Sequence, residues 1–181
     1  ADEQGRPVRG QAKCKEERKV TCLPFSLYSG SYAKRRKRKG ETVMESCKLV
    51  KPDIGMVEEI RAYRQAMVAA NSSMDGMGTL RATDDPAEWL AAIRAMESPD
   101  TVPEGLVTAE QFVYVRERDG RIVGMIQYRH RLNDHLLKYG GHIGYSIRPD
   151  ERRKGYAKAM LKDCLAYCRA KGLDRALITC L

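Results

Sequence analysis

The sequence predicts an α/β protein with a mixed sheet, and three observations support this fold class. Segments with strand and helix patterns follow one another along residues 44–181 in the order strand, helix, helix, three strands, helix, strand. Two β-rich runs flank Asp119-Gly120, a pair that is typical of hairpin turns. A further strand leads into a helix through the charged, glycine-containing turn "RPDERRKGYA". Strands and helices that alternate in this way form layered α/β structures.

The first half of the domain supplies one strand and two helices. Residues 46–51, "SCKLVK", form a strand, and Pro52-Asp53 then open a helix that ends at Asn71. Residues 71–78, "NSSMDGMG", have the composition of a mobile loop. Asp85 and Pro86 are an N-cap and first-turn pair for a second helix that ends at Met96. Both helices carry apolar residues at helical spacing, which we expect in the core: Met56, Val57, Ile60, Tyr63, Met67, Trp89, Leu90 and Ile93.

The second half contains the hairpin and a strand–helix–strand unit. The runs "QFVYVRER" and "RIVGMIQY" are predicted to pair through a two-residue turn at Asp119-Gly120. A charged connection, "RHRLNDHLLKYGG", leads to a strand over residues 142–149. The next helix runs from about 157 to 171, with Gly172 as its C-terminal stop. "LDRALITCL" forms the last strand.

The basic charge of the chain is concentrated at one end. The formal net charge is +9, but residues 1–43 hold 12 Lys/Arg against 5 Asp/Glu, whereas residues 44–181 hold 21 against 19. The run Lys34 to Lys39, "KRRKRK", can bind nucleic acid through counterion release. No aromatic residue is interleaved to stack on bases, so we favour a solvated, disordered run and do not expect nucleic-acid binding.

We also expect residues 1–43 to be translated upstream sequence. The first methionine is Met44, where amphipathic patterning begins, and the codons of Lys39-Gly40-Glu41 can spell a bacterial ribosome-binding site. We therefore divide the chain into a basic, disordered or non-native tail, 1–43, and a domain, 44–181. Mass spectrometry that detects peptides from residues 1–38 in the native protein would contradict a non-native tail.

Composition excludes several other classes of protein. No apolar run is long enough to span a bilayer, and the start lacks a secretory signal, so we expect a cytoplasmic protein without membrane contact. The six cysteines form no CxxC pair, and no histidine stands at zinc-finger spacing, so no metal site is expected. No dinucleotide-binding or NTPase glycine motif occurs.

The turn before the last predicted helix is suited to an anion. Arg152, Arg153 and Lys154 precede Gly155 at the helix start. The first N–H groups of a helix lack intrahelical acceptors, the helix dipole adds partial positive charge there, and glycine allows close approach to the main chain. A phosphate group fits these properties.

At these residues the sequence resembles the GNAT superfamily of acyl-CoA N-acyltransferases. "RRKGYA" matches the R/Q-x-x-G-x-G/A signature with Arg152, Gly155 and Ala157, and the order of elements over residues 46–181 is similar. The resemblance implies a mostly antiparallel central sheet flanked by helices, and acetyl-CoA as co-substrate. It also implies that the loop holds the pyrophosphate and that the preceding strand contacts the pantetheine arm. The cofactor-binding residues implied are Tyr145, Ser146, Ile147, Arg152, Arg153, Lys154, Gly155, Tyr156 and Ala157.

The resemblance implies transfer of an acetyl group to a primary amine. The amine must be neutral to attack, so the site must desolvate it or offer a base, for which His142 and Glu110 are candidates. A backbone N–H near residues 145–147 is implied as the oxyanion donor. His130, Arg131 and Asn133 lie where the family's acceptor site is expected. Antibiotics, polyamines, peptide N-termini and lysine all remain possible acceptors.

The sequence departs from the family pattern at its end. Family members continue with another helix and two strands, which usually supply an Asn on the cofactor and a Tyr that protonates the thiolate, whereas this sequence stops at Leu181. We expect an exposed sheet edge that favours homodimers or self-association. A non-catalytic acyl-CoA-binding module and a basic-tailed nucleic-acid-binding protein are the alternative functions.

Overall fold

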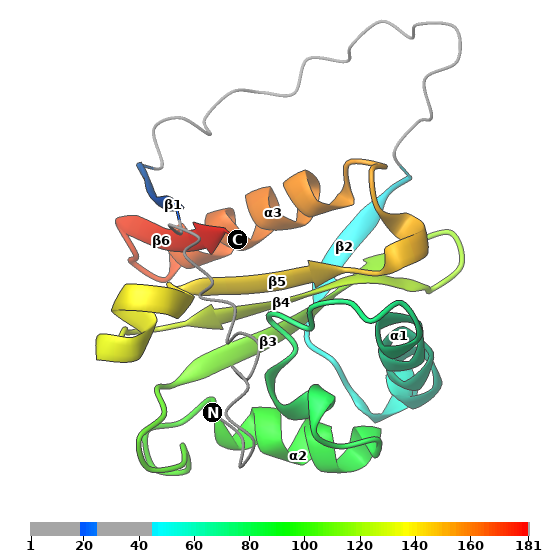
Figure 1. The fold of residues 1–181 in the computed structure, drawn as a ribbon, viewed down its shortest axis with the longest axis horizontal. Helices are drawn as coiled ribbons and strands as arrows, with labels where there is room; N and C mark the ends of the chain where they lie inside the picture. The colour runs from blue at the N-terminus through cyan, green and yellow to red at the C-terminus, as the bar shows by residue number, and fades with distance from the viewer. Residues whose placement is uncertain (1–18, 25–44, 181) are drawn as a thin grey trace, which may run out of the picture.

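The computed structural model describes residues 19–24 and 45–180, and its central element is a four-stranded antiparallel sheet (Figure 1). The strands lie in the order β2-β3-β4-β5. Their bounds are Cys47–Val50, Ala109–Arg116, Ile122–Arg129 and Ile143–Ile147. Helices cover both faces of the sheet, which confirms the predicted α/β class with a mostly antiparallel sheet.

The helices occupy opposite sides of this sheet (Figure 1). On one side lie α1 (Val57–Ala69) and α2 (Pro86–Ala95), and on the other side lies α3 (Tyr156–Ala170). All three predicted helices are confirmed to within about two residues at most of their ends. The side chain of Asp85 caps α2 by accepting a hydrogen bond from the amide of Ala87 at 2.9 Å.

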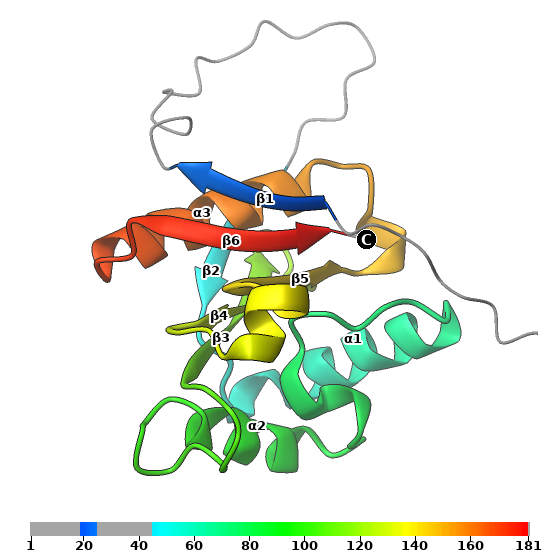
Figure 2. The same cartoon turned by 60° about the vertical axis from the view of Figure 1, so that its left-hand side comes forward.

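Two further strands form a separate pair (Figure 2). β6 (Arg175–Cys180) pairs antiparallel with β1 (Lys19–Pro24). β1 lies within the tail for which the sequence predicts no ordered element, so the structure differs there, because strand pairing depends on a partner far away in the sequence. The basic run at 34–39 lies outside the described residues, and the division of the chain at residue 44 stays a prediction.

The hairpin between β3 and β4 is confirmed, but its turn is longer than predicted. The amide of Arg116 donates to the carbonyl of Arg121 at 2.9 Å, so residues 117–120 form a four-residue connection. The amide of Gly120 donates back to the carbonyl of Arg116, and Gly120 has a φ of 70°. Asp119 turns its carboxylate to Arg116 at 2.7 Å. The amide of Glu117 donates to the carbonyl of Ser46 at 2.9 Å and so continues the pairing of β3 with β2 by one residue.

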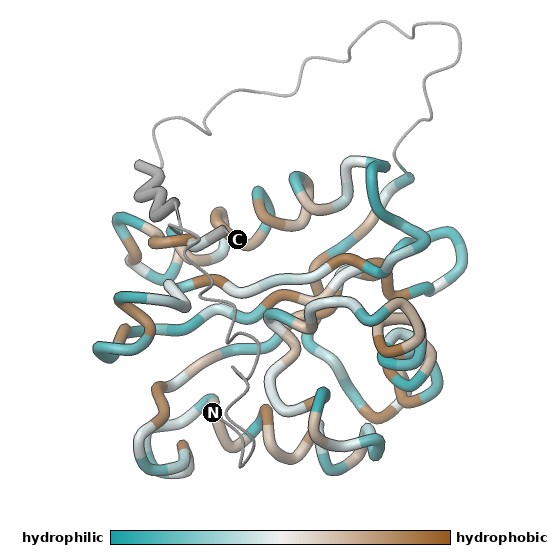
Figure 3. The backbone as a smooth tube through the Cα atoms, viewed as in Figure 1, coloured by the Kyte–Doolittle hydropathy of each residue, from teal (hydrophilic) through white to brown (hydrophobic). Residues whose placement is uncertain are grey.

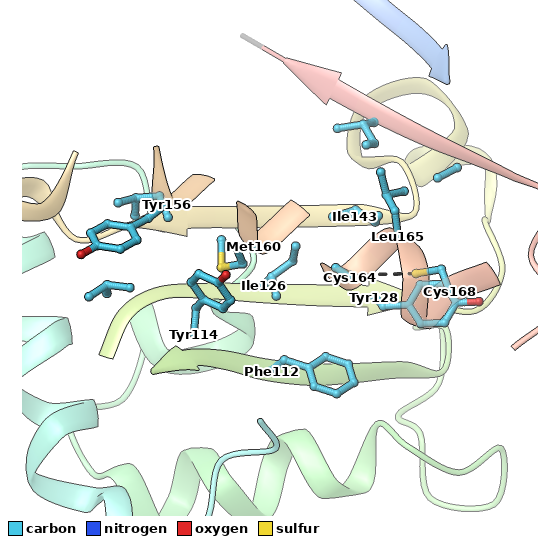
Figure 4. Packing of buried hydrophobic residues seen from close by; sticks show 14 residues of the cluster. Phe112, Tyr114, Ile126, Tyr128, Ile143, Tyr156, Met160, Cys164, Leu165 and Cys168 are labelled. Atoms are coloured by element: carbon cyan, nitrogen blue, oxygen red, sulfur yellow. Dashed lines mark hydrogen bonds between the residues drawn. The ribbon is translucent and has the colours of Figure 1, made fainter. Parts of the chain in front are cut away.

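The alternation of side chains along β3 and β4 divides the core into two clusters. Figure 3 shows apolar residues following the strands and the helix faces that meet them. One cluster joins α1 and α2 to the sheet around the fully buried Tyr63 and Trp89. The other packs α3 against the sheet around Met160 and Cys164 (Figure 4). Cys164 and Cys168 contact one another at 4.0 Å between sulfur atoms, as buried thiols on one helix face.

Replacing Asp85 with alanine should lower the free energy of unfolding by roughly 1 kcal/mol, because the first turn of α2 loses its cap. Urea unfolding followed by circular dichroism measures the change. The control is Asp84→Ala, since Asp84 is an exposed neighbour that does not cap the helix. Equal losses in the two variants would show that the cap contributes nothing.

Candidate functional site

β5 is joined to β6 at one point and separated from it beyond that point. The amide of His142 donates to the carbonyl of Leu177 at 2.8 Å, and the amide of Leu177 donates to Nδ1 of His142 at 3.0 Å. After this junction the two strands belong to different sheets, although they run in the same direction (Figure 1). One edge of β5 is therefore open towards its C-terminal end.

The register of β5 determines which backbone groups lie on that edge. The amide of Arg129 donates to the carbonyl of His142 at 2.8 Å, and the amide of Arg148 donates to the carbonyl of Val123 at 3.0 Å. In an antiparallel ladder, residues that face the partner strand alternate with residues that face away. The N–H and C=O groups of Tyr145 and Ile147 consequently point away from β4, towards the open edge.

The start of α3 presents a row of backbone amides next to this edge. Gly155 is the N-cap residue with φ 91°, and it supplies no side chain to cap the helix. The first bond of the helix runs from the amide of Ala159 to the carbonyl of Gly155 at 3.2 Å. Within the described part of the chain, the amides of residues 153–158 have no acceptor. Such a row of N–H groups, with the positive end of the helix dipole, attracts an anion.

These features line one cleft of about 760 Å³. Of the nine residues predicted to bind the cofactor, all except Lys154 line it: Tyr145, Ser146, Ile147, Arg152, Arg153, Gly155, Tyr156 and Ala157. The facing wall is formed by residues 70–73 and Asp75, at the end of α1 and in the loop after it. The structure thus brings the predicted loop and the predicted strand together in one concave surface.

The three predicted cations have different partners. Arg152 donates from Nε to the carbonyl of Ile147 at 3.1 Å and from Nη2 to the hydroxyl of Ser72, so it ties the loop to both walls. Lys154 pairs at 2.8 Å with Glu151, which also accepts from Arg116 at 3.0 Å. Burial alone would raise the pKa of Glu151, but its bonds with Lys154 and Arg116 lower it overall. Arg153 is exposed at the cleft with φ 61°.

A second pocket of about 480 Å³ lies on the other side of the loop after α1. Asp75 lines both pockets. The loop crosses β5 at Gly76, where an added Cβ would be only 2.1 Å from the carbonyl oxygen of Gly144. Gln111 holds the crossing by donating to the carbonyl of Gly76 at 2.8 Å. This segment was expected to be a mobile loop, but it docks on β5 because two glycine backbones can approach closely there.

The predicted bases lie outside the lining of both pockets. His142 serves the β5–β6 junction, and burial, followed by the charge of Arg129, lowers its pKa. Glu110 lies on β3 and accepts from Tyr167 at 2.8 Å, from His130 at 3.2 Å and from Lys51 at 3.1 Å. Although burial raises the pKa of Glu110, these partners lower it overall. Both side chains already have specific hydrogen-bond partners.

The residues predicted to contact the acceptor separate in the structure. Asn133 lines the second pocket, where it donates to the carbonyl of Gly105 at 3.3 Å and accepts from the amide of Leu136 at 3.0 Å. His130 and Arg131 are exposed and do not line the pocket. Sequence reasoning missed Asp75 and Arg129, which do line it. The glycines of "MDGMG" beside Asp75 were the available signal of a close backbone contact.

Replacing His142 with asparagine should flatten the pH dependence of stability between about pH 7.5 and about pH 5.5. The folded-state pKa of His142 lies below its ordinary value of 6.5, so neutral imidazole stabilises the fold above that pH. This stability is lost as the pH falls and the ring is protonated. The asparagine carbonyl can still accept from Leu177, and it does not titrate.

Urea unfolding at several pH values measures this effect, with His135→Asn as the control because His135 is exposed. An unchanged pH slope in His142→Asn, or an equal change in both variants, would contradict the structural role given to the imidazole.

One of three comparisons with known proteins found a match. The sequence model described as the Acetyltransferase (GNAT) family matches residues 76–181, which include β3 to β6 and the amide row at the start of α3. No curated protein and no solved structure matches the chain. Among the described helices, none is both long and apolar enough to span a membrane. Since the match covers more than half of the sequence, this chain belongs to the GNAT acetyltransferase family.

Proposed function

We propose that this chain is an N-acetyltransferase that moves an acetyl group from acetyl-CoA to a primary amine. Its family implies an acyl-CoA co-substrate. The observation that carries the proposal is the row of amides at 153–158, which lack acceptors and lie in a cleft beside the open edge of β5. The acyltransferase domain then corresponds to residues 44–181.

The cleft fits the two parts of coenzyme A that differ most in chemistry. The amide row and Arg153 suit the pyrophosphate, and the absence of a Cβ at Gly155 leaves room for it. The outward N–H of Ile147 suits a carbonyl of the pantetheine arm, which would extend along β5 as a strand does, while the carbonyl of Ile147 already accepts from Arg152. Bound in this way, the thioester lies near the Gly76–Gly144 crossing, where the two pockets meet.

The protein contributes positioning and charge stabilisation to the reaction. An N–H on the outer edge of β5, among residues 145–147, donates to the oxyanion that forms when the amine attacks the thioester. The departing thiolate has an ordinary pKa of about 8.5 and needs little acid help. Holding the amine against the thioester accounts for a large part of the acceleration.

The amine must lose a proton, since the pKa of a free amine is about 10.4. Asp75 is the carboxylate that lines both pockets, so we propose that it binds the amine and accepts its proton, directly or through water. Under this proposal His142 and Glu110, the bases expected from the sequence, lie outside the pockets and have structural roles instead. His142 positions β5 through its hydrogen bond with Leu177, and Glu110 joins the start of β3 to Tyr167 on α3.

Replacing Gly155 with aspartate should weaken acetyl-CoA binding by at least about tenfold, because a carboxylate then faces the phosphates at the amide row. Titration calorimetry measures the affinity. Gly172→Asp is the matched control, since Gly172 has a similar φ of 87° at the other end of α3 and nothing within 4 Å of an added Cβ. Both variants incur a left-handed backbone cost of roughly 1–2 kcal/mol, but only Gly155→Asp should lose binding. Equal affinities in the two variants would overturn the proposed cradle.

Turnover distinguishes an enzyme from a non-catalytic acyl-CoA-binding module. With acetyl-CoA and a panel of primary amines, we expect release of free thiol that depends on both substrates, detected with a thiol reagent. Tight acetyl-CoA binding without thiol release on any amine would favour the binding module instead.

A further inference from the structure

The second pocket is lined by one half-buried arginine, Arg129, and one aspartate, Asp75, and this pairing indicates the class of acceptor. We propose that the acceptor is an α-amino acid whose carboxylate binds Arg129 and whose amine faces Asp75. This inference rests on the proposed acetyltransferase function and goes beyond it by naming the chemical class of the amine.

One nitrogen of the Arg129 guanidinium is hydrogen-bonded within the protein, and the other two can bind a ligand. Nη1 donates to the carbonyls of Gly140 and Gly141, at 3.0 and 3.1 Å. In the described part of the chain, Nε and Nη2 have no acceptor, and the residue lines the pocket. Burial lowers the pKa of Arg129, and the charge of Asp75 opposes this effect. A guanidinium that is fixed at one nitrogen and partly desolvated is suited to a carboxylate, which it can bind through two parallel hydrogen bonds.

Asp75 faces the same space without neutralising Arg129 by direct contact. No ion pair joins the two among the described residues, although their charges interact. Asp75 accepts from the hydroxyl of Ser73 and is exposed where the two pockets meet. A cation and an anion that are kept apart in one pocket match a zwitterion, whose ammonium and carboxylate groups satisfy both. A simple amine leaves Arg129 without an anion, and such a mismatch reduces affinity.

The position of Arg129 determines how far the carboxylate can be from the attacking amine. Nη2 lies 3.0 Å from the place that a Cβ on Gly144 would occupy. Gly144 precedes Tyr145, whose backbone faces the proposed thioester position. A carboxylate bound to Nη2 is consequently close to the reacting carbonyl, so only a short link can separate it from the amine. This spacing favours α-amino acids over peptides, polyamines or lysine side chains.

The remaining wall of the pocket suits an apolar side chain. Six apolar residues line it: Met74, Met96, Leu106, Val107, Ala109 and Leu136. We therefore expect leucine, methionine or phenylalanine to bind better than acidic or basic amino acids.

The test compares amino acids with the matched amines that lack the carboxylate. L-leucine, L-methionine and L-phenylalanine are titrated by calorimetry into the full chain in the presence of free coenzyme A, alongside 3-methylbutylamine, 3-(methylthio)propylamine and 2-phenylethylamine. We expect at least one amino acid to bind 10- to 100-fold more tightly than its matched amine, on the order of a charge-assisted hydrogen-bonded pair. The same amino acid should give the highest kcat/KM for thiol release.

Variants of Arg129 assign this preference to its side chain. Arg129→Met should remove most of the preference, because it weakens binding of the amino acid and relieves the unpaired charge that disfavours the matched amine, and Arg129→Lys should restore part of the preference. Arg169→Met on the exposed face of α3 is the control. If Arg129→Met fails to fold, the preference measured in Arg129→Lys and in the wild-type protein still tests the role of Arg129.

The outcomes separate this inference from the proposed function. Acetylation of amines with no preference for a carboxylate would overturn the amino-acid acceptor and leave the acetyltransferase standing. A preference that survives in both Arg129 variants would overturn the role of Arg129. Amino-acid binding without thiol release would overturn the acceptor role, and failure to bind acetyl-CoA would overturn the proposed function itself.

Discussion

The edge of β5 beyond His142 has no hydrogen-bonded strand beside it in the described part of the chain, and the candidate site depends on this gap. In a continuous sheet, β6 would hydrogen-bond along this edge, whereas here the carbonyl of Ile147 accepts from the side chain of Arg152. The paired bonds between His142 and Leu177 hold the strands together at one end only. From α1, the hydroxyl of Tyr63 donates to the carbonyl of Ser146 at 3.0 Å and braces the open part of β5. A rigid strand with an open edge is thus available to a ligand.

The proposed anion site beside this edge relies on backbone dipoles more than on side-chain cations. Arg152 and Lys154 are engaged within the protein, and they fix the loop before α3 instead of facing the cleft freely. Buried Glu151 connects Lys154 to Arg116 on β3, so the loop is anchored to the central sheet. Donors that are oriented before the ligand arrives require no reorganisation when it binds, which is the basis of electrostatic preorganisation.

The loop after α1 divides the concave surface into two regions of different chemistry. Its crossing at Gly76 and Gly144 places the amide row on one side and the Arg129 pocket on the other. Gln111 on β3 donates a hydrogen bond to the carbonyl of Gly76 at this crossing, so the sheet fixes the position of both regions. A site for two substrates requires such an arrangement, because each substrate must be bound separately while their reacting atoms meet.

The sequence by itself determined the order of elements from β2 to β6, the α/β class, both apolar helix faces and the glycine loop before α3, since these depend on local periodicity and local backbone preference. Eight of the nine residues that it predicted to bind a cofactor line one cleft, because a strand and the helix that directly follows it are adjacent. Only the tertiary structure decided that Lys154 turns to Glu151, that His142 pins β5 to β6, and that Asp75 and Arg129 share a pocket. These outcomes depend on contacts between residues far apart in the chain, which no local pattern encodes.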